Sequence, residues 1–434
     1  MDPNSENSTQ RSEKYFKYLV FILILVLILD NYTQFYSSVI PSKIVEEFLG
    51  GYPQNEANSI FTISLAIVSI GSYVVFVVWY SADKVGRRFL LVLSVFGMVA
   101  ASIGILFSRN IVEYTIYRFL LGIFVGSDIW LIYITEESPP ERKAFWTNIV
   151  LVGGMIGVIL MPVFRSIYIT ETSPVGAWRG MTYFSIIFGI PLGILVALTV
   201  KETSKFQEIK DNRPATKERT KVLKKNLNLI FKSEKKRRSA YIAILVISLI
   251  RAVVGVFISL GELYMADSPY LNEGDINIVV YVLGASVIAG FLMTGMLADK
   301  IGRKPLFYIF FVMLIIGAII FIYGALTPGI ALLLVCIGMS LINIAYWGLY
   351  VILSIVVIEL IPTEARGTGN GFRGLMGSFG STIGLILTSV LVLFFSLQIV
   401  FLIFALMLLI DLPIIYKYVI ETKGTDLSDL TIVS

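Results

Sequence analysis

Two stretches of this 434-residue chain, SADKVGRR at 81–88 and LADKIGRK at 297–304, are close copies of each other. Two further pairs recur at nearly the same offset: YITEESPPERK at 133–143 matches VIELIPTEAR at 357–366, and Glu202-Thr203 matches Glu421-Thr422. The paired residues Asp83 and Asp299 are 216 positions apart, and Glu136 and Glu359 are 223 apart. A near-constant offset at three places predicts two halves built as parallel repeats.

The segments between these motifs are long and apolar. Hydrophobic residues make up 56% of the chain and charged residues 15%, and the mean hydropathy is +0.83. A soluble protein carries about 25% charged residues, so this chain needs lipid as its solvent. Because the apolar runs are continuous and do not alternate, they favour helices over a barrel. We predict an all-α polytopic membrane protein with twelve transmembrane helices, at 18–40, 60–78, 89–107, 111–135, 149–164, 183–200, 241–250, 276–297, 306–326, 330–358, 375–400 and 401–410.

One long polar stretch, residues 201–238, lies between the sixth and seventh predicted spans. It divides the chain into an N-terminal six-helix half at 1–200, a cytoplasmic linker at 201–238 and a C-terminal six-helix half at 239–434 with a cytoplasmic tail. Within the linker, residues 226–231 either form a short amphipathic helix along the membrane or belong to a solvated loop.

The net charge of +5 is explained by topology and not by nucleic-acid binding. With the polar segments assigned alternately to two sides, 28 Lys and Arg fall on one side, four on the other and three inside spans. The positive-inside rule then predicts that both termini are cytoplasmic. The first seventeen residues are polar and the first apolar run is too long for a cleaved signal peptide, so none is expected.

The chain has no histidine and a single cysteine, Cys336, which lies in a predicted span. These residues cannot build a metal site, so no metal and no cofactor is expected. No nucleophile–base pair points to an enzyme either. Proton transfer, if the protein uses it, must run through carboxylates.

The loop motifs resemble those of the major facilitator superfamily of transporters. The C-terminal copy carries the family's G-x-L-A-D-K/R-x-G-R-R/K pattern, at Gly295, Leu297, Ala298, Asp299, Lys300, Gly302, Arg303 and Lys304. The N-terminal copy keeps Asp83, Gly86, Arg87 and Arg88 but has Trp79 where the family has glycine. The resemblance implies that each charged cluster is a latch that breaks as the two halves rock.

The fourth predicted span is similar to that of the sugar porters and the organic-acid:proton symporters within the superfamily. RFLLGIFVGSDIW at 118–130 follows their R-x3-G-x3-G spacing, and Glu136 with Lys143, and Glu359 with Arg366, follow their E-x6-R loops. The endings KETSKF and ETKG resemble those of sugar porters. The seventh predicted span lacks the Q-L-S pattern of sugar porters, which speaks against a sugar.

Two acids inside predicted spans are candidates for proton coupling, because ionisable residues in lipid are costly and mark functional sites. Asp30 lies in LILDNYTQFY of span one, at a position that looks like the first Asp of the D-x-x-D pair of organic-acid symporters; Thr33 stands at the second. Asp128 stands where those symporters have a glutamate. For each, the alternative is a purely structural acid.

Other polar groups inside predicted spans are candidates for substrate contact. Arg251 of span seven would either bind an anionic substrate or pair with Asp30 or Asp128, and Arg118 would either face the cavity or extend to the membrane interface. Asn343, Tyr346 and Trp347 of span ten could line a site for a small polar ligand. We place Glu262, Asp411 and Arg373 at span ends, as interface residues.

We therefore expect a monomeric secondary transporter of the cell membrane that imports a small organic acid with protons by alternating access. The alternatives are a sugar or polyol porter, an efflux antiporter for amphipathic compounds and a transporter-like sensor. The expected partners are a small-molecule substrate, protons and the lipid bilayer, without nucleic acid.

Overall fold

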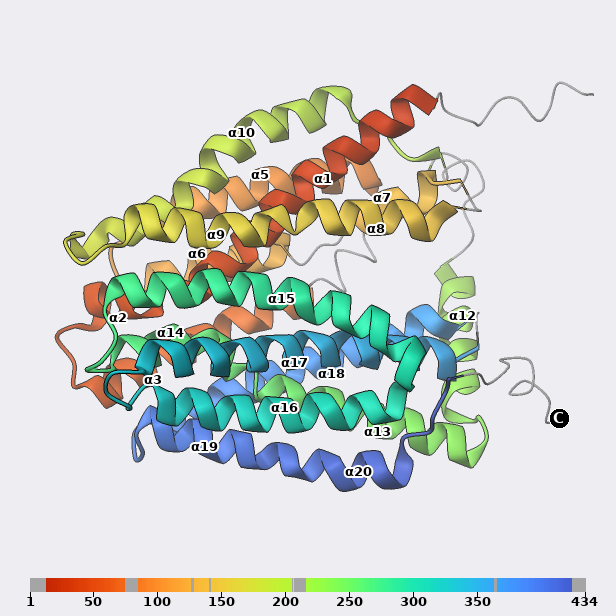
Figure 1. Ribbon diagram of the computed structural model, residues 1–434. Coiled ribbons are helices and arrows are strands. Elements are labelled where there is room, and N and C mark those ends of the chain that lie inside the picture. Colours follow the sequence, from red (N-terminus) through yellow and green to blue (C-terminus); the bar gives the residue numbers. More distant parts are fainter. Residues whose placement is uncertain are drawn as a thin grey trace, which may run out of the picture. The chain divides into compact units, whose positions relative to one another are not determined.

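The protein is described by a computed structural model that covers residues 13–74, 85–125, 129–139, 142–204, 206, 216–362 and 365–423. Within these residues every regular element is helical. The chain divides into two compact units, and we describe each unit by itself (Figure 1). The first unit comprises Met1–Ser37, Ile70–Tyr168 and Ala177–Pro214, and the second comprises Ser38–Ser69, Ile169–Gly176 and Ala215–Ser434.

The first unit is built around α1, which packs against α8, α9 and α10. The 3-10 segment η1, Tyr36–Val39, continues α1 across the boundary of the unit, and η4, Val175–Gly180, leads into α10. The helices of the first unit, in chain order, are α1 (Glu13–Phe35), the 3-10 segment η2 (Gly71–Val74), α5 (Arg87–Leu106), α6 (Ile111–Val125), α7 (Ile129–Glu137), α8 (Lys143–Gly154), α9 (Ile156–Tyr168) and α10 (Met181–Thr199).

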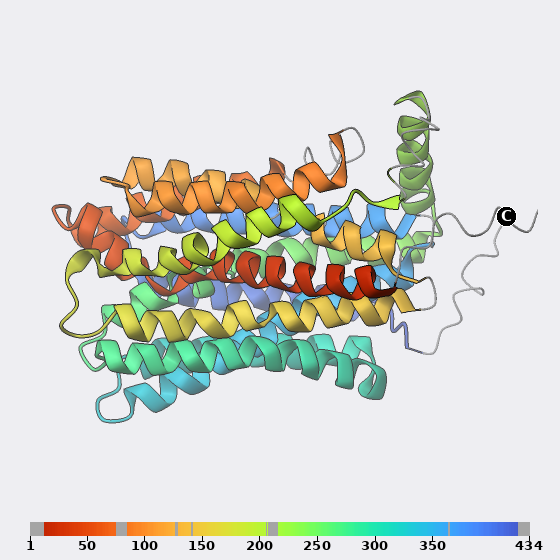
Figure 2. The ribbon, with the colours of Figure 1, turned by 90° about the horizontal axis from the view of Figure 1, so that it is seen from above.

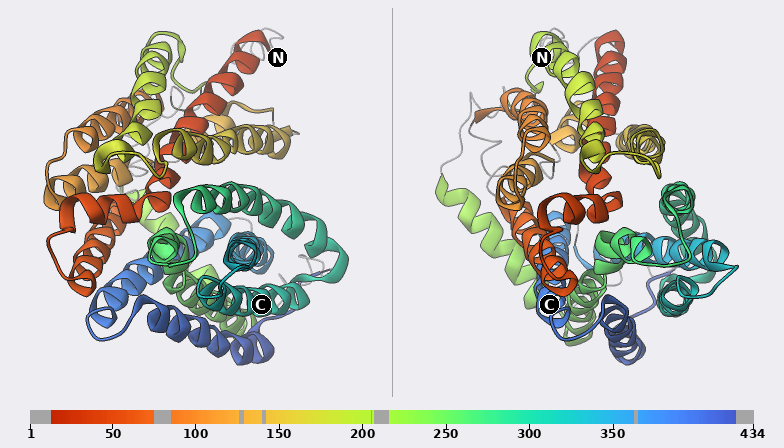
Figure 3. Two further views of the ribbon diagram at one scale, coloured as in Figure 1. Left: turned by 60° about the vertical axis from the view of Figure 1, so that its left-hand side comes forward. Right: turned by 90° about the vertical axis from the view of Figure 1, so that its left-hand side faces the viewer.

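The second unit contains the whole C-terminal repeat together with residues 38–69, which connect the first two predicted spans and include part of each. In it α17 lies between α15 and α16, and α13 packs along α18; the right-hand view of Figure 3 shows these helices along their axes. Its helices are α2 (Pro41–Leu49), α3 (Gln54–Ile70), α12 (Thr216–Phe231), α13 (Lys235–Val253), α14 (Val256–Ala266), α15 (Glu273–Ile301), α16 (Arg303–Gly324), α17 (Ala331–Leu360), α18 (Arg366–Leu391), α19 (Leu397–Met407), the 3-10 segment η6 (Leu408–Ile410) and α20 (Asp411–Tyr418).

A glycine allows a close helix approach in the second unit. A Cβ atom added to Gly380 of α18 would lie 2.2 Å from the carbonyl oxygen of Leu249 in α13, so only glycine allows the two backbones to approach this far. This approach places the middle of α18 directly beside the turn of α13 that carries Arg251.

The helices lie at the predicted places, but several bounds differ: spans predicted at 241–250, 375–400 and 401–410 run over Lys235–Ala266, Arg366–Leu391 and Leu397–Tyr418. Eleven helical segments of the described residues are long and apolar enough to cross a membrane; of the twelve predicted spans, 60–78 ends outside the described residues. In the predicted linker, α12 extends from Thr216 to Phe231, well beyond the predicted 226–231, and runs across the direction of the spanning helices of its unit (Figure 2).

Candidate gating, proton and substrate sites

The N-terminal loop cluster consists of Arg87, Glu136, Glu202 and Thr203. Arg87 Nη2 lies 3.1 Å from Glu136 Oε1, and both side chains are almost fully buried. Thr203 Oγ1 donates to the second oxygen of Glu136 at 2.6 Å, while the Arg87 N–H donates to Glu202 Oε1 at 2.9 Å. The carboxylate of Glu202 therefore caps the first turn of α5, and Glu136 neutralises the arginine beneath it.

The C-terminal loop cluster, Arg303, Glu359, Glu421 and Thr422, repeats this arrangement. Arg303 binds Glu359 through Nε at 3.2 Å and Nη2 at 2.6 Å, and Thr422 Oγ1 also donates to Glu359. The backbone N–H groups of Arg303 and Lys304 each donate to Glu421 at 2.9 Å. The three sequence pairs that define the repeat thus meet at one place in each half.

The glycine before each of these helices is required by geometry. Gly86 and Gly302 have φ angles of 104° and 97°, a region that side chains disfavour. A Cβ atom there would also lie 2.5 Å from Glu202 Oε2 and 2.7 Å from Glu421 Oε2. Glycine therefore provides both the turn and the space for the capping carboxylate.

Burial and hydrogen bonding act in opposite directions on Glu421. Partial burial raises the pKa of its carboxyl group, but the backbone N–H groups of Arg303, Lys423, Lys304 and Thr422 together lower it by a larger amount, and the pKa is below its usual value. The group is therefore ionised when it caps α16.

The remaining predicted loop residues are placed as follows. Asp299 is mostly exposed and lies 3.1 Å from Arg303 Nη2, so it is a second, peripheral partner of that guanidinium group. The structure does not bring Arg366 to Glu359 or Lys143 to Glu136: Arg366 donates to the Ile361 carbonyl and Lys143 is exposed at the start of α8. Arg88 donates to the Ala197 carbonyl, Lys304 to that of Tyr416, Gly295 lies inside α15, and Asp83 is outside the described residues.

Within the first unit, Arg118 of α6 is buried against the end of α1. Its guanidinium donates to the Thr33 carbonyl at 3.4 Å and to Ser37 Oγ, and its Cζ lies 5.6 Å from the centre of the Tyr36 ring. Arg118 thus holds the point where α1 changes into the 3-10 turn η1. It makes no ion pair with any described residue.

Asp30 lies one turn before Thr33 on α1 and is only 8% exposed. It is therefore a buried carboxyl group on the helix that Arg118 holds, although the hydrogen bonds of Arg118 go to Thr33 and Ser37. The other predicted acid, Asp128, is outside the described residues.

Within the second unit, Arg251 of α13 is 6% exposed and lies against α17. Its Nη1 donates to the Tyr346 carbonyl at 2.9 Å, and its Cζ lies 4.0 Å from the Tyr346 ring centre and 5.6 Å from that of Tyr350. Three of the predicted site residues belong to this face of α17: Asn343 is fully buried, and Tyr346 stacks edge-on against Trp347 at 5.5 Å.

Arg373 is a site residue whose predicted place, at a span end, is wrong. It is only 4% exposed, its Nε donates to Asn370 Oδ1 at 2.8 Å, and its Cζ lies 4.7 Å from the Tyr350 ring centre. The predicted span begins at residue 375, but α18 begins at Arg366 because the glycine-rich stretch 367–374 continues the helix despite its low hydropathy. The sequence signal that could have indicated the buried position of Arg373 is a cation within a glycine-rich stretch directly before an apolar run.

A further group of polar contacts ties residues 38–69 to the C-terminal repeat inside the second unit. Ser42 donates to Glu262 of α14 through its backbone N–H at 2.8 Å and its hydroxyl at 2.6 Å. Glu262 lies near the end of its span, as predicted, but it is not exposed at an interface: it is 2% exposed, and both of its oxygens accept hydrogen bonds from Ser42. Asp411, also predicted at an interface, is fully buried in span twelve.

Three more contacts extend this group, which we call the outer contacts. Lys43 Nζ lies 2.8 Å from Glu273 Oε1, Gln54 donates to Asp267 at 2.6 Å, and the hydroxyls of Ser69 and Thr382 are 2.6 Å apart. Burial raises the pKa of Asp267, and the hydrogen bond from Gln54 offsets only part of that effect.

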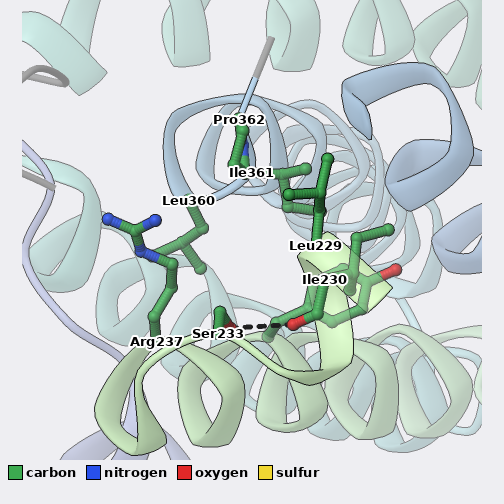
Figure 4. A pocket seen from close by; sticks show the side chains of 8 residues that line it. Leu229, Ile230, Ser233, Arg237, Leu360, Ile361 and Pro362 are labelled. Carbon is green, nitrogen blue, oxygen red and sulfur yellow. Dashed lines mark hydrogen bonds between the residues drawn. The ribbon is translucent and has the colours of Figure 1, made fainter. Parts of the chain in front are cut away.

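The groove in Figure 4 belongs to another part of the second unit. Leu229 and Ile230 of α12, Ser233, Arg237 of α13 and the segment Leu360–Pro362 line it, and Figure 4 shows the hydrogen bond from Ser233 to the Ile230 carbonyl. None of the predicted site residues lines this groove, so we assign it no role in transport.

The loop clusters, the repeat and the helical units can now be compared with known proteins. A sequence model of the Major Facilitator Superfamily matches residues 20–357. The chain belongs to the Major Facilitator Superfamily. It is accordingly a multi-pass membrane protein and a secondary transporter of a small molecule, not an enzyme.

Relatives in this superfamily transport both organic acids and sugars. A probable 4-methylmuconolactone transporter of Cupriavidus pinatubonensis is 23% identical, with 82% of this chain and 80% of that protein covered. The cis,cis-muconate transport protein of Acinetobacter baylyi is 22% identical, with 76% of each covered. The glucose transporter GlcP of Staphylococcus epidermidis is 23% identical, with 80% and 82% covered.

Solved structures of the superfamily share the fold. A D-xylose-proton symporter matches with a TM-score of 0.78 at 18% identity, over 95% of this chain and 99% of that one. The inward-open xylose transporter XylE of Escherichia coli matches with a TM-score of 0.73 at 18% identity, over 96% and 99%. The predicted fold class, twelve spanning helices of the major facilitator type, is confirmed.

Proposed function

We propose that this transporter is a proton-coupled symporter of a small organic anion. The observation that carries the proposal is Arg251, a buried guanidinium in the middle of a spanning helix that has no carboxylate partner among the described residues. A buried cation without an anion is costly, and a bound carboxylate would remove that cost while matching the planar donors of arginine. The muconate and muconolactone relatives support this substrate class.

Asp30 and Asp128 are the proposed proton carriers. The chain has no histidine, so a carboxyl group must bind the proton. Asp30 is buried on α1, close to the point where α1 changes into η1 and where Arg118 binds the backbone. A change in the charge of Asp30 would therefore act on this end of α1. Arg118 is then a positioning residue for span one.

We propose that the protein is a monomer in the plasma membrane. In the proposed orientation, both termini and the linker 201–238 lie in the cytoplasm. The distribution of 28 basic residues against four supports this orientation. Cysteines introduced into 201–238 should resist an impermeant thiol reagent added to intact cells, and cysteines in 267–272 should react. The reverse labelling pattern would contradict the orientation.

In this orientation the outer contacts close the extracellular side, and the two loop clusters lie on the cytoplasmic side. Alternating access then requires the outer contacts to break when the substrate enters. Ser42–Glu262 and Lys43–Glu273 are the charged members of this gate.

The test is uptake into proteoliposomes that contain the purified protein. We expect a pH gradient to drive accumulation of radiolabelled cis,cis-muconate, and unlabelled muconate inside the vesicles to support counterflow without a gradient. Counterflow with no response to the gradient would contradict proton coupling. Transport of glucose or xylose and not of the acid would contradict the substrate class.

A sugar porter is the second candidate. The glucose and xylose transporters among the relatives favour it. The buried cations Arg251 and Arg373 and the missing Q-L-S pattern of span seven oppose it, because a neutral sugar would not compensate a buried positive charge.

A further inference from the structure

Arg251 does not stand alone in the second unit. The guanidinium of Arg373 on α18 lies 4.7 Å from the centre of the Tyr350 ring, and that of Arg251 on α13 lies 5.6 Å from the same centre. One tyrosine of α17 therefore contacts two buried cations that come from different helices. The two groups are close enough for their like charges to repel each other.

No acidic residue compensates this pair in the part of its own repeat that the structure describes. Neither arginine forms an ion pair with a described residue. The sequence itself contains no Asp or Glu in 239–261, 276–298, 331–358 or 365–410, which include the central parts of spans seven, eight, ten and eleven. Contacts with tyrosine rings offset only part of the free-energy cost of burying two like charges. Among the described residues of the second unit, no negative charge balances the two cations.

The surroundings of the pair are aromatic and partly accessible. Trp347 packs against Tyr346, Tyr350 and, in a stacked arrangement, Phe291 at 5.9 Å. Tyr350, whose ring contacts both cations, is 39% exposed, so the pair lies directly below an accessible surface. Such rings favour a flat, unsaturated body between the charged ends of a ligand.

We infer that Arg251 and Arg373 together bind a dicarboxylate, one carboxylate to each guanidinium, and that the substrate is a small unsaturated dianion. This inference rests on the proposed function and narrows it from organic anions to dianions. Nε of Arg251 has no hydrogen-bond partner among the described residues. Arg373 donates through Nε to Asn370 and also bonds to Tyr350, so each guanidinium has further N–H donors left for a carboxylate.

Two acids with the same six-carbon diene test the inference. trans,trans-Muconate carries a carboxylate at both ends and sorbate at one end only. Affinities are measured by calorimetry with the purified full-length protein, at a pH where all carboxyl groups are ionised. We expect the wild type to bind muconate about tenfold more tightly than sorbate, the gain typical of one charge-assisted contact.

Arg373→Gln should lower the affinity for muconate about tenfold and change that for sorbate less than about threefold. Arg373→Lys keeps the charge without the planar guanidinium group. It should reduce the logarithm of the ratio between the muconate and sorbate affinities by about half. Arg238→Gln removes an exposed cation from the same helix as Arg251 and should change nothing. Size-exclusion elution and the melting temperature establish that each variant is folded.

Equal affinity of the wild type for the two acids would overturn the dicarboxylate site while leaving organic-acid transport intact. An unchanged preference for muconate in either folded Arg373 variant would also overturn it. An equal loss of affinity for both acids in Arg373→Gln would do the same, because it would show that Arg373 has a structural role. Binding of glucose or xylose without binding of either acid would overturn the proposed function and this inference with it.

Discussion

The two repeats agree at their loops and differ in their membrane interior. Each loop cluster contains an arginine after a positive-φ glycine, a glutamate from the fourth or tenth span, and a Glu-Thr pair that caps the helix. In the interior, the N-terminal repeat has Asp30, the predicted acid Asp128 and the buried arginines Arg118 and Arg165. The C-terminal repeat has Arg251 and Arg373 within long acid-free stretches and a buried acid, Asp411, in span twelve. The features that occur twice are the loop clusters that we predict to act as latches in the two halves. The proposed function divides the chemistry between the repeats, with protons assigned to Asp30 and Asp128 of the first and the anion to the arginine pair of the second.

The largest expected effect tests this division at its acidic side. Asp30→Asn fixes the residue in a neutral, protonated-like form, so binding and exchange survive but net proton movement stops. We expect muconate uptake driven by a pH gradient to fall more than about tenfold and counterflow to stay within about threefold of wild type.

Asp128→Asn should show the same separation if Asp128 carries the proton in place of Asp30. Arg251→Gln, in contrast, should reduce both activities, because it removes substrate binding. Gradient-driven accumulation at the wild-type level in both Asn variants would end the division between the repeats.

A smaller effect is expected at the outer contacts, where the first repeat supplies donors and the second supplies the carboxylate. Glu262→Gln retains one acceptor for Ser42 but loses the charge-assisted bond, and this weakens the closed gate by about 1 kcal/mol. Ser259 lies on α14, about one turn before Glu262. In a Cys336→Ser background, the cysteine of a Ser259→Cys variant should then react with an impermeant thiol reagent about fivefold faster.

The matched control is Glu46→Gln, which alters a half-exposed partner of Lys43 on the same surface and should leave the labelling rate unchanged. Equal rates in wild type and Glu262→Gln would show that Ser42–Glu262 does not limit opening.

The loop clusters provide a comparison of burial. Glu136 and Arg87 have side-chain exposures of 10% and 4%, whereas Glu359 and Arg303 have 21% and 12%, and Arg303 has Asp299 as a second partner. Glu136→Gln should therefore lower the melting temperature in detergent by about 5 °C and Glu359→Gln by about half as much. An equal or reversed order would show that burial does not set the strength of the two clusters.

The smallest effect concerns pH. Because the folded-state pKa of Glu421 is lowered, its contribution is fully present above the unfolded value of 4.5 and is lost as the pH falls through the folded value. Glu421→Gln should lower the melting temperature by about 3 °C at neutral pH, with the difference from wild type shrinking in acid. A constant difference down to about pH 3 would contradict the lowered pKa.

Much of this organisation could be predicted from the sequence. The pairs 83/299, 136/359 and 202/421 indicate the repeat, and continuous apolar runs indicate the spans, because lipid leaves few options for the backbone. Arg251 is recognisable as a charge inside an apolar run. The burial of Arg373 within α18 was missed because the glycines around it lower the hydropathy of that segment. Glycine also makes α18 narrow enough to approach α13 closely.

Other features depend on tertiary interactions that no local pattern contains. Glu262 looks like an interface acid until Ser42, 220 residues away, is seen to donate to both of its oxygens. The match of Glu202-Thr203 with Glu421-Thr422 is visible in the sequence, but its role as a cap becomes clear only where those residues meet the glycine turn.

The loop clusters also impose an order on biosynthesis. All residues of the N-terminal cluster are present once the ribosome has added Thr203. Arg87 can therefore pair with Glu136 before the second repeat has been synthesised. The C-terminal cluster waits for Thr422, and until then the N–H groups at the start of α16 and the guanidinium of Arg303 lack the Glu421 cap. Nascent chains stalled before residue 421 would therefore carry one finished half and one unfinished half, and membrane quality control would have a defined structural difference to act on.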